Sequence, residues 1–460
     1  QDCAARGIGR ITRGSAADSL LCYCLGISNV CPIRLELYFK RFLNRDRMAL
    51  QKLPDIDIDF AHDRKDDVVR LLLDKYGPEH AAIVGGFSTF QARAAVGDVA
   101  KVLGVAESEI HQLTKHLPWT DARHAADAVA LSRECAHTAW QEEPLRTALL
   151  MAGRLDGFPR YAKMHPCGVV LSRDPIRDLA PTFISQKGWP TTHFDMDAVE
   201  AVGLIKLDIL AQGGLAVLRD TQTALKSQGL AVDLHALETG GAGGTETSPR
   251  TVPVEPWSDA AVWEMTASGN ARGVHHIESP AMTSLACMAG VRDIDRLVAI
   301  VSVIRPGAAN GLKKAQFSRR AQGLEPVVYP HESLAPVLRS TFGVVAYEEH
   351  ILQICEAFAG LPPGRADVLR RALVKQDVAK IAEIRAEFIT AAHARHHAEA
   401  LIAEVWNLVA GFQGYAFCRA HSTAYAVEAY QGAYLKCYHP AEFMAGVLTN
   451  GKGFYSPLVY

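Results

Sequence analysis

The chain has 460 residues, of which 49% are hydrophobic and 21% charged, a size that allows about three domains with their own cores. It contains no run of about 18 apolar residues, so no membrane-spanning helix is expected, and its net charge of −2 means that a polyanion would have to bind at local basic patches. Ten cysteines in a chain of this length favour reduced thiols in a cytoplasm over a disulfide scaffold.

The first motif along the chain is a Gly-Ser turn, which lies in Arg13–Ser19 and precedes an apolar run at Leu20–Leu25. A Gly-Ser turn that opens a helix offers backbone N–H groups and the positive end of the helix dipole to a phosphate. Such turns are common, and Ser15 also fits a second interpretation, as the N-cap of a helix.

The second motif is a row of acids in Leu53–Phe60, where Asp55, Asp57 and Asp59 alternate with apolar residues. In a β-strand these three carboxylates share one face. Aspartate is depleted in strands and like charges on one face repel each other, so the row predicts a neutralising cation. A solvated strand face remains an alternative for this segment alone.

A second acid-bearing strand is predicted at Leu204–Leu210, where Lys206 and Asp208 share a face. Two such strands side by side would form an all-oxygen site of the kind that binds Mg²⁺. Between the two strands the pattern is helical, and a further strand is predicted at Cys167–Leu171. The helical block is therefore predicted to be an insertion in one α/β domain; its four helices are expected at Ala92–Leu103, Glu107–His116, Ala122–Ala139 and Pro144–Arg154.

The rest of the chain is predicted to be mostly helical after a flexible segment at residues 239–251. The expected helices are Glu348–Phe358, Arg365–Leu373, Val378–His397, Ala400–Val409 and Thr423–Tyr438. Several basic residues are candidates for contacts with phosphate, although a solvated helix face is the alternative for each run. They are Arg305, Lys313, Lys314, Arg319, Arg320, Arg370, Arg371 and Lys375.

Taken in order, several segments closely resemble the catalytic core of bacterial C-family DNA polymerases, the family of the polymerase III alpha subunit. The resemblance runs over nearly the whole chain, and the chain's start, which lacks Met, suggests the middle of a longer protein. The matching segments are Arg13–Ala17, Arg41–Asn44, Pro54–Phe60, Lys206–Asp208, Ile277–Met282, Arg305–Gly307, Tyr347–His350, Leu369–Ala372 and His421–Tyr425.

The resemblance implies an α/β fold joined to an α-helical region: a polymerase-β-like nucleotidyltransferase palm with an inserted helical thumb and large, mostly helical fingers. The implied palm consists of residues 1–87 and 164–213, the thumb of residues 88–163, and the fingers of residues 214–460. The first part of the palm would be truncated at its N-terminal end, and the fingers would be incomplete at their C-terminal end.

The resemblance also assigns roles to residues. Asp55, Asp57 and Asp208 would be the catalytic ligands of two Mg²⁺ ions, which Mn²⁺ could replace, whereas Asp59 is demoted. The triphosphate contacts map to Gly14, Ser15, Arg41, Lys206, Arg370 and Arg371, and His421 joins the candidate DNA contacts. One departure from the family is Asp18, which replaces a small or amide residue and adds negative charge near the expected phosphate site.

The implied activity is template-directed addition of deoxynucleotides to a primer 3′-hydroxyl, with primer-template DNA and dNTPs as partners in the bacterial cytoplasm, at the nucleoid. The segments His165–Val170, Arg305–Asn310 and Leu361–Asp367 look more like the error-prone, translesion branch used in DNA damage tolerance. Sliding clamp and mutasome-type accessory proteins would bind regions missing here. The alternatives are a replicative polymerase core, a non-catalytic DNA-binding remnant, and a template-independent nucleotidyltransferase.

Overall fold

The computed structural model describes residues 2–45, 56–135, 139–237, 251–255, 257–304, 311–412 and 417–460. The chain forms two compact units, residues 1–68 with 208–460 and residues 69–207. The division falls within one helix and one strand, and it differs from the predicted palm and thumb boundaries. The domain assignment therefore stays a prediction.

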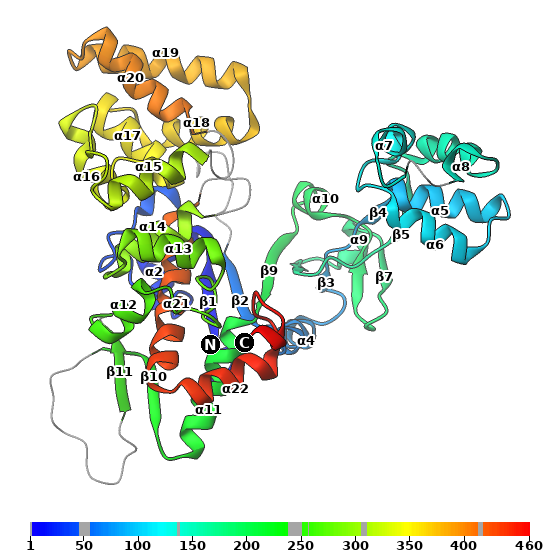
Figure 1. Ribbon diagram of the computed structural model, residues 1–460, viewed down its shortest axis with the longest axis horizontal. Helices are drawn as coiled ribbons and strands as arrows, with labels where there is room; N and C mark the ends of the chain where they lie inside the picture. The colour runs from blue at the N-terminus through cyan, green and yellow to red at the C-terminus, as the bar shows by residue number, and fades with distance from the viewer. Residues whose placement is uncertain are drawn as a thin grey trace. The chain divides into compact units, whose positions relative to one another are not determined.

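Two neighbouring strands carry the predicted acids, and a third strand pairs with one of them (Figure 1). They are β1 (Arg10–Arg13), β2 (Asp57–Ala61) and β9 (Ile205–Gln212), whose first three residues belong to the smaller unit. β2 pairs antiparallel with β1 and parallel with β9. A second pair of parallel strands is formed by β10 (Ala231–Leu237) and β11 (Thr251–Glu255). Of the predicted flexible segment, residues 239–250 are outside the described residues, and Thr251 begins β11.

The main core of the larger unit surrounds α21 (Arg419–Tyr438), which is buried on every side from Ala420 to Leu435. A helix that is apolar or small-sided all round lies inside a core rather than on its surface. Figure 1 shows α21 passing beside β1. The other helices around this core are α11 (Gly214–Ser227), α12 (Ala260–Ala267), α13 (Pro280–Ala289), α14 (Ile294–Val303), α15 (Gly311–Ala321) and α22 (Pro440–Asn450).

A second core in the same unit is entirely helical. It includes Phe358, Phe388 and Trp406, whose rings pack at centroid distances of 5.4–6.0 Å. Its elements are α16 (Ala335–Leu338), α17 (Glu348–Ile354) with a π-helical turn at Cys355–Ala359, α18 (Pro363–Lys375), α19 (Val378–Ala394) and α20 (Glu399–Ala410). Shorter pieces of the unit are α1 (Asp2–Ala5), α2 (Leu20–Cys24) and a 3-10 turn at Phe39–Arg41.

The smaller unit combines a strand region with a helical region. Its four paired strands follow the order β6-β3-β8-β7, and β4 pairs with β5. These strands are β3 (Ala81–Ile83), β4 (Phe87–Thr89), β5 (Pro159–Ala162), β6 (Gly168–Leu171), β7 (Thr182–Ile184) and β8 (Pro190–Thr192). The helices are α5 (Ala92–Val102), α6 (Glu107–His116), α7 (Ala125–Leu131), α8 (Leu145–Ala152), α9 (Ile176–Leu179) and α10 (Met196–Ala201), and α4 (Lys65–Tyr76) crosses from the larger unit.

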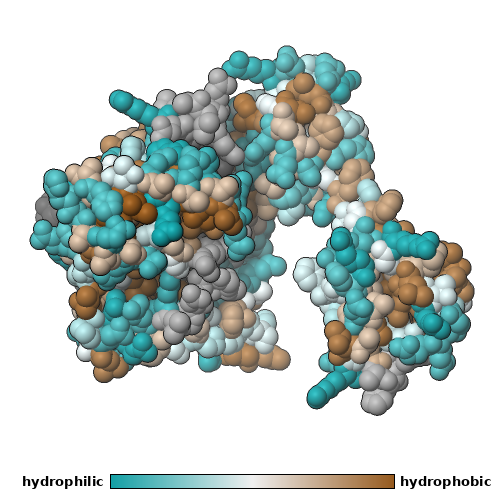
Figure 2. Space-filling view, turned by 90° about the horizontal axis from the view of Figure 1, so that it is seen from above, coloured by the Kyte–Doolittle hydropathy of each residue, from teal (hydrophilic) through white to brown (hydrophobic). Residues whose placement is uncertain are grey.

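Apolar side chains reach the surface of the helical region, as the brown atoms of Figure 2 show. The most exposed of them are Val102, Trp119 and Leu131. In the part of the chain that the structure describes, no helix combines the length and the apolar character that crossing a membrane requires.

Most predicted elements are present, but two helices have different bounds and several strands were not predicted. The helix predicted at 122–139 is replaced by a 3-10 turn and α7, which ends at Leu131 because Ser132 is extended. The helix predicted from Thr423 begins at Arg419, so His421 and Ser422 lie inside it. Eight of the described strands were not predicted, namely β1, β3, β4, β5, β7, β8, β10 and β11.

Candidate active site

Two of the predicted acids lie side by side on neighbouring strands. In the parallel pair of β2 and β9, Ile58 is level with Ile209, and the residues one step earlier are Asp57 and Asp208. Their side chains share one face of the sheet, on strands that lie about 4.8 Å apart. Both residues are half-buried. Paired carboxylates are the oxygen ligands that hard divalent cations prefer, so these residues fit Mg²⁺.

The predicted third ligand, Asp55, lies outside the described residues. Lys206 stands two positions before Asp208 on β9, so the two side chains share a face of that strand, as predicted. Lys206 is half-buried.

Asp59 has a different environment from Asp57. It is fully buried, accepts a hydrogen bond from the Tyr425 hydroxyl at 2.7 Å, and lies 3.4 Å from an Arg13 guanidinium nitrogen. Burial raises the pKa of Asp59, while Tyr425 and Arg13 act to lower it. Asp59 thus connects β2 to α21, which fits its demotion as a metal ligand.

The Gly-Ser turn lies directly against Asp57. Gly14 adopts a φ of +70°, and a Cβ built on it would lie 3.4 Å from Oδ2 of Asp57. Glycine tolerates this backbone conformation, which other L-residues rarely adopt. The turn brings its backbone close to the carboxylate, as a site for a metal-bound phosphate requires.

The turn differs from the predicted helix start. Residues Gly14–Asp18 form a short 3-10 helix, and Ser19, rather than Ser15, caps α2 by accepting a hydrogen bond from the Cys22 N–H. Ser15 is half-buried. The Gly14 N–H donates to Nδ1 of His421 at 3.3 Å, so this N–H is already engaged.

The predicted phosphate-binding arginines are brought together by two acids. Glu348, in the first turn of α17, accepts hydrogen bonds from Arg41 Nε and from Arg370 Nη1, each at 3.0 Å. Asp367 accepts from Arg370 Nε at 2.9 Å and from Arg371 Nη2 at 2.7 Å. Burial alone would raise the pKa of Asp367, but the two arginines outweigh burial and lower it.

The candidate DNA contacts are mostly used within the protein. Lys313 donates to the Gly411 carbonyl at 2.8 Å, and burial lowers its pKa. Arg319 and Arg320 both pair with Glu325 at 3.0 Å. Lys314 is half-buried and Lys375 is exposed at the end of α18, while Arg305 lies outside the described residues.

His421, predicted as a candidate DNA contact, has a buried environment in the structure. It is buried inside α21, stacks on Phe417 at a centroid distance of 4.8 Å, and accepts the Gly14 N–H. Its side chain contacts the Gly14 turn from the protein interior and does not face solvent.

Several residues of the site were not predicted from the sequence. Arg13 and Tyr425 hold Asp59, and Glu348 and Asp367 hold the arginines. Glu348 and Tyr425 lie in motifs that were recognised without a role for them. The alternation of side chains along β1 could have identified Arg13, which is paired with Asp57 on β2.

Comparison with known proteins covers most of the chain. Residues 2–211 match the family described as the bacterial DNA polymerase III alpha NTPase domain, and residues 215–396 match the bacterial DNA polymerase III alpha subunit finger domain.

The chain is 34% identical over 445 residues to a DNA polymerase III subunit alpha of Thermus aquaticus, covering 95% of this chain and 35% of that protein. It is 33% identical over 442 residues to the Bacillus subtilis protein of the same name, covering 96% of this chain and 38% of that protein. It is also 34% identical over 458 residues to an error-prone DNA polymerase of Symbiobacterium thermophilum, covering 98% of this chain and 40% of that protein. The chain thus spans 35–40% of the length of these relatives. With both parts of its length matched by that family, the chain belongs to the bacterial DNA polymerase III alpha subunit family.

Proposed function

We propose that this chain carries the catalytic core of a DNA-directed DNA polymerase, which adds deoxynucleotides to a primer 3′-hydroxyl under the direction of a template. The observation that supports this most strongly is the register of β2 and β9, in which Asp57 and Asp208 each stand one residue before the paired Ile58 and Ile209. Membership of the polymerase III alpha family supplies the substrate class.

In this proposal Asp55, Asp57 and Asp208 hold two Mg²⁺ ions, or Mn²⁺ in their place. When bound, the ions would supply the positive charge that activates the 3′-hydroxyl and stabilises the pyrophosphate leaving group. The chain's own contribution is to fix the carboxylates on strands rather than on loops. Asp59 adds to that rigidity through its bonds to Tyr425 and Arg13.

The triphosphate would lie along the Gly-Ser turn, with Arg41, Lys206, Arg370 and Arg371 opposing its negative charge. Arg41 and Arg370 already share the carboxylate of Glu348. On binding, a triphosphate oxygen would replace Glu348 as the acceptor of guanidinium hydrogen bonds. Before the nucleotide arrives, Glu348 keeps the arginines ordered, which lowers the entropy lost on binding.

We assign the chain to the error-prone, translesion branch, active in DNA repair and damage tolerance in the bacterial cytoplasm. The amino-acid sequences of His165–Val170 and Leu361–Asp367 support this branch. Relatives named for both branches match at 34% identity, so the branch depends on those segments. Sliding clamp and mutasome-type accessory proteins would be its further partners.

The test compares Asp57→Asn with Asp63→Asn, a matched control whose carboxylate pairs with Arg219 away from the acid pair. Binding of Mn²⁺ is measured by titration, and primer extension is measured with Mg²⁺, with and without template. We expect Asp57→Asn to lose both Mn²⁺ binding and extension, and Asp63→Asn to keep them.

Extension without template would instead support a template-independent nucleotidyltransferase. Unchanged Mn²⁺ binding by Asp57→Asn would remove the metal assignment. DNA binding without any incorporation by the unsubstituted chain would favour a non-catalytic remnant. A lesion-bearing template that blocks extension as strongly as it blocks a replicative polymerase would argue against the error-prone branch.

A further inference from the structure

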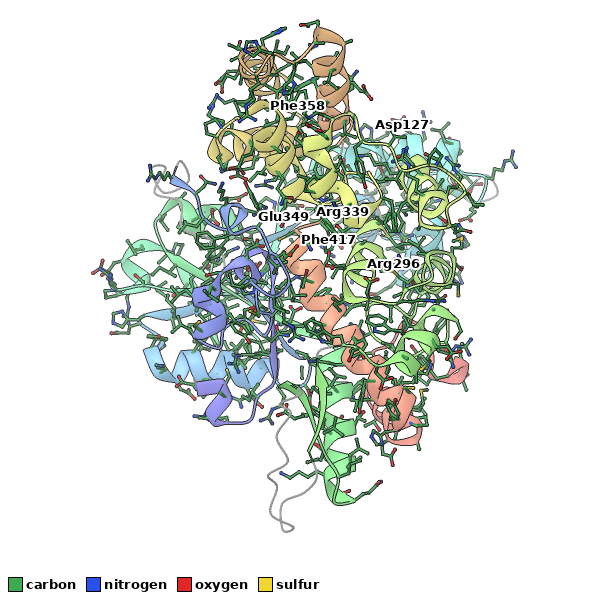
Figure 3. The ribbon with its side chains drawn as sticks, turned by 90° about the vertical axis from the view of Figure 1, so that its left-hand side faces the viewer. Asp127, Arg296, Arg339, Glu349, Phe358 and Phe417 are labelled. Atoms are coloured by element: carbon green, nitrogen blue, oxygen red, sulfur yellow. The ribbon has the colours of Figure 1, made fainter. Side chains whose placement is uncertain are left out.

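Three side chains with metal-ligating atoms converge behind the proposed phosphate-binding residues. Asp18, Glu349 and Cys418 each place one carboxylate oxygen or thiol sulfur within 4.8 Å of the others. Asp18 ends the 3-10 turn after β1, Glu349 lies in the first turn of α17, and Cys418 is the N-cap of α21. Figure 3 shows Glu349 beside Phe417, the residue before Cys418.

The cluster is deeply buried, since Asp18 and Glu349 are each 1% exposed and Cys418 is 9% exposed. An ionised carboxylate in such a place is strongly destabilising unless its charge and hydrogen-bonding capacity are compensated. Neither oxygen of Asp18, nor Oε1 of Glu349, makes a hydrogen bond of normal geometry with the described residues. Burial and the neighbouring Glu349 together raise the pKa of Asp18, and the Tyr38 backbone opposes them only weakly.

The guanidinium groups of nearby arginines do not bond these acids, although the Arg419 backbone N–H donates to Oε2 of Glu349 at 2.8 Å. Arg41 donates through Nε and Nη2 to Glu348. Arg419 donates through Nη1 to the Glu36 carbonyl and through Nη2 to Asp295. Both guanidinium groups act at a distance to lower the pKa of Asp18, but their hydrogen bonds go elsewhere.

We propose that Asp18, Glu349 and Cys418 form a structural zinc site. Two carboxylates and one thiolate are ligands that Zn²⁺ accepts, whereas Mg²⁺ and Ca²⁺ prefer oxygen ligands alone. The ion would supply the positive charge that the buried carboxylates lack. As the sulfur–zinc bond forms, the thiol proton passes to solvent, so binding strengthens as pH rises.

The site would connect three segments that carry the proposed phosphate-binding groups. Asp18 lies on the same turn as Gly14, Glu349 follows the Glu348 that holds Arg41, and Cys418 precedes the helix that carries His421. Zinc would therefore fix the phosphate end of the active site. This consequence rests on the proposed function, whereas the metal site itself does not.

The test measures the zinc content of the purified chain and its absorption spectrum after replacement of zinc by Co²⁺. We expect one zinc ion per chain and a sulfur-to-cobalt charge-transfer band. Cys418→Ser is expected to abolish the band, and Asp18→Asn to lower the zinc content severalfold. The matched control is Cys437→Ser, in the last turn of the same α21, which keeps both signals.

Two results would overturn the site: no charge-transfer band in the unsubstituted chain, or an equal band in Cys418→Ser. The spectrum of the unsubstituted chain decides the question even where a variant fails to fold. Asp57→Asn separates this site from the polymerase proposal, because it is expected to lose primer extension while keeping zinc and the cobalt band. If the purified chain contains no zinc and Asp18→Asn makes it more stable, Asp18 and Glu349 share a proton instead of a metal.

Discussion

The Tyr425 hydroxyl holds β2 to α21 through Asp59, and Tyr425→Phe removes that hydrogen bond alone. The bond is 2.7 Å long and its acceptor is fully buried, while the other partner, Arg13, stands 3.4 Å away. A hydrogen bond to a charged group contributes about 1.5–3 kcal/mol. We therefore expect the variant to lower the free energy of unfolding by about 2 kcal/mol at neutral pH.

Urea denaturation of a double-mutant cycle measures this bond. The cycle compares Tyr425→Phe, Asp59→Asn and the double variant, and we expect a coupling energy of about 1.5 kcal/mol or more. Tyr434→Phe, on the same helix, is the matched control, because the Tyr434 side chain is also buried and its hydroxyl makes no hydrogen bond with the described residues. Its effect is expected to be clearly smaller.

The pH dependence gives a second check. Burial raises the pKa of Asp59, and the bond from Tyr425 opposes that rise. A raised carboxyl pKa means that the folded state binds a proton more readily than the unfolded chain, so this group adds stability as pH falls. The cost of Tyr425→Phe should shrink in acid as Asp59 becomes protonated. A cost equal to that of Tyr434→Phe, or a coupling within about 0.5 kcal/mol of zero, would refute the reasoning.

Three further predictions concern the site and its support. Gly14 has a φ of +70°, and the Cβ that Gly14→Ala adds would lie 3.4 Å from Oδ2 of Asp57. The substitution should lower the free energy of unfolding by about 1–2 kcal/mol and weaken Mn²⁺ binding in a titration. An unchanged Mn²⁺ affinity would contradict the close approach of the turn to Asp57. Arg370→Lys lacks the planar fork that bonds Asp367 and Glu348 through separate nitrogens, so its unfolding free energy should fall by about 1–2 kcal/mol in urea. An unchanged midpoint would count against the network. Burial raises the pKa of Glu428 from its ordinary value of 4.5 to about 7. The stability of the wild-type protein, relative to that of Glu428→Gln, should therefore fall as pH rises from 4.5 to about 7. Parallel curves of stability against pH for the two proteins would exclude this titration.

Regular elements could be predicted because their patterns are local. The helix expected at Glu107–His116 has those bounds in the structure, and the strand expected at Leu204–Leu210 is β9 with a short extension. Alternation also placed Lys206 and Asp208 on one face. Each of these conclusions needs only neighbours a few residues away.

The partners of the charged residues could not be predicted, because they lie far away along the chain. Arg41 meets Glu348 across 307 positions, and Tyr425 meets Asp59 across 366. No periodicity links such residues, and a motif identifies a side chain without naming its partner. The arginines were therefore assigned to phosphate while the acids that hold them were missed.

His421 shows a different limit. The prediction began the helix at Thr423, two residues after His421, and named His421 as a candidate DNA contact. The helix begins at Arg419 and is buried on every side, so it has no polar stripe from which its orientation or its start could be read. Burial by surrounding helices decided the outcome, and burial of this kind leaves no local signal.

One helix links the metal and phosphate halves of the site. From α21, Tyr425 bonds Asp59 on β2, Glu428 bonds Gln212 at the end of β9, and His421 bonds the Gly14 turn. A substitution that shifts α21 should therefore change metal and nucleotide binding together. A substitution in α18, whose Arg370 bonds Glu348 and Asp367, should change nucleotide binding and leave Mn²⁺ affinity unaltered. Comparing the two affinities across variants of both helices separates positioning by α21 from charge supplied by α18.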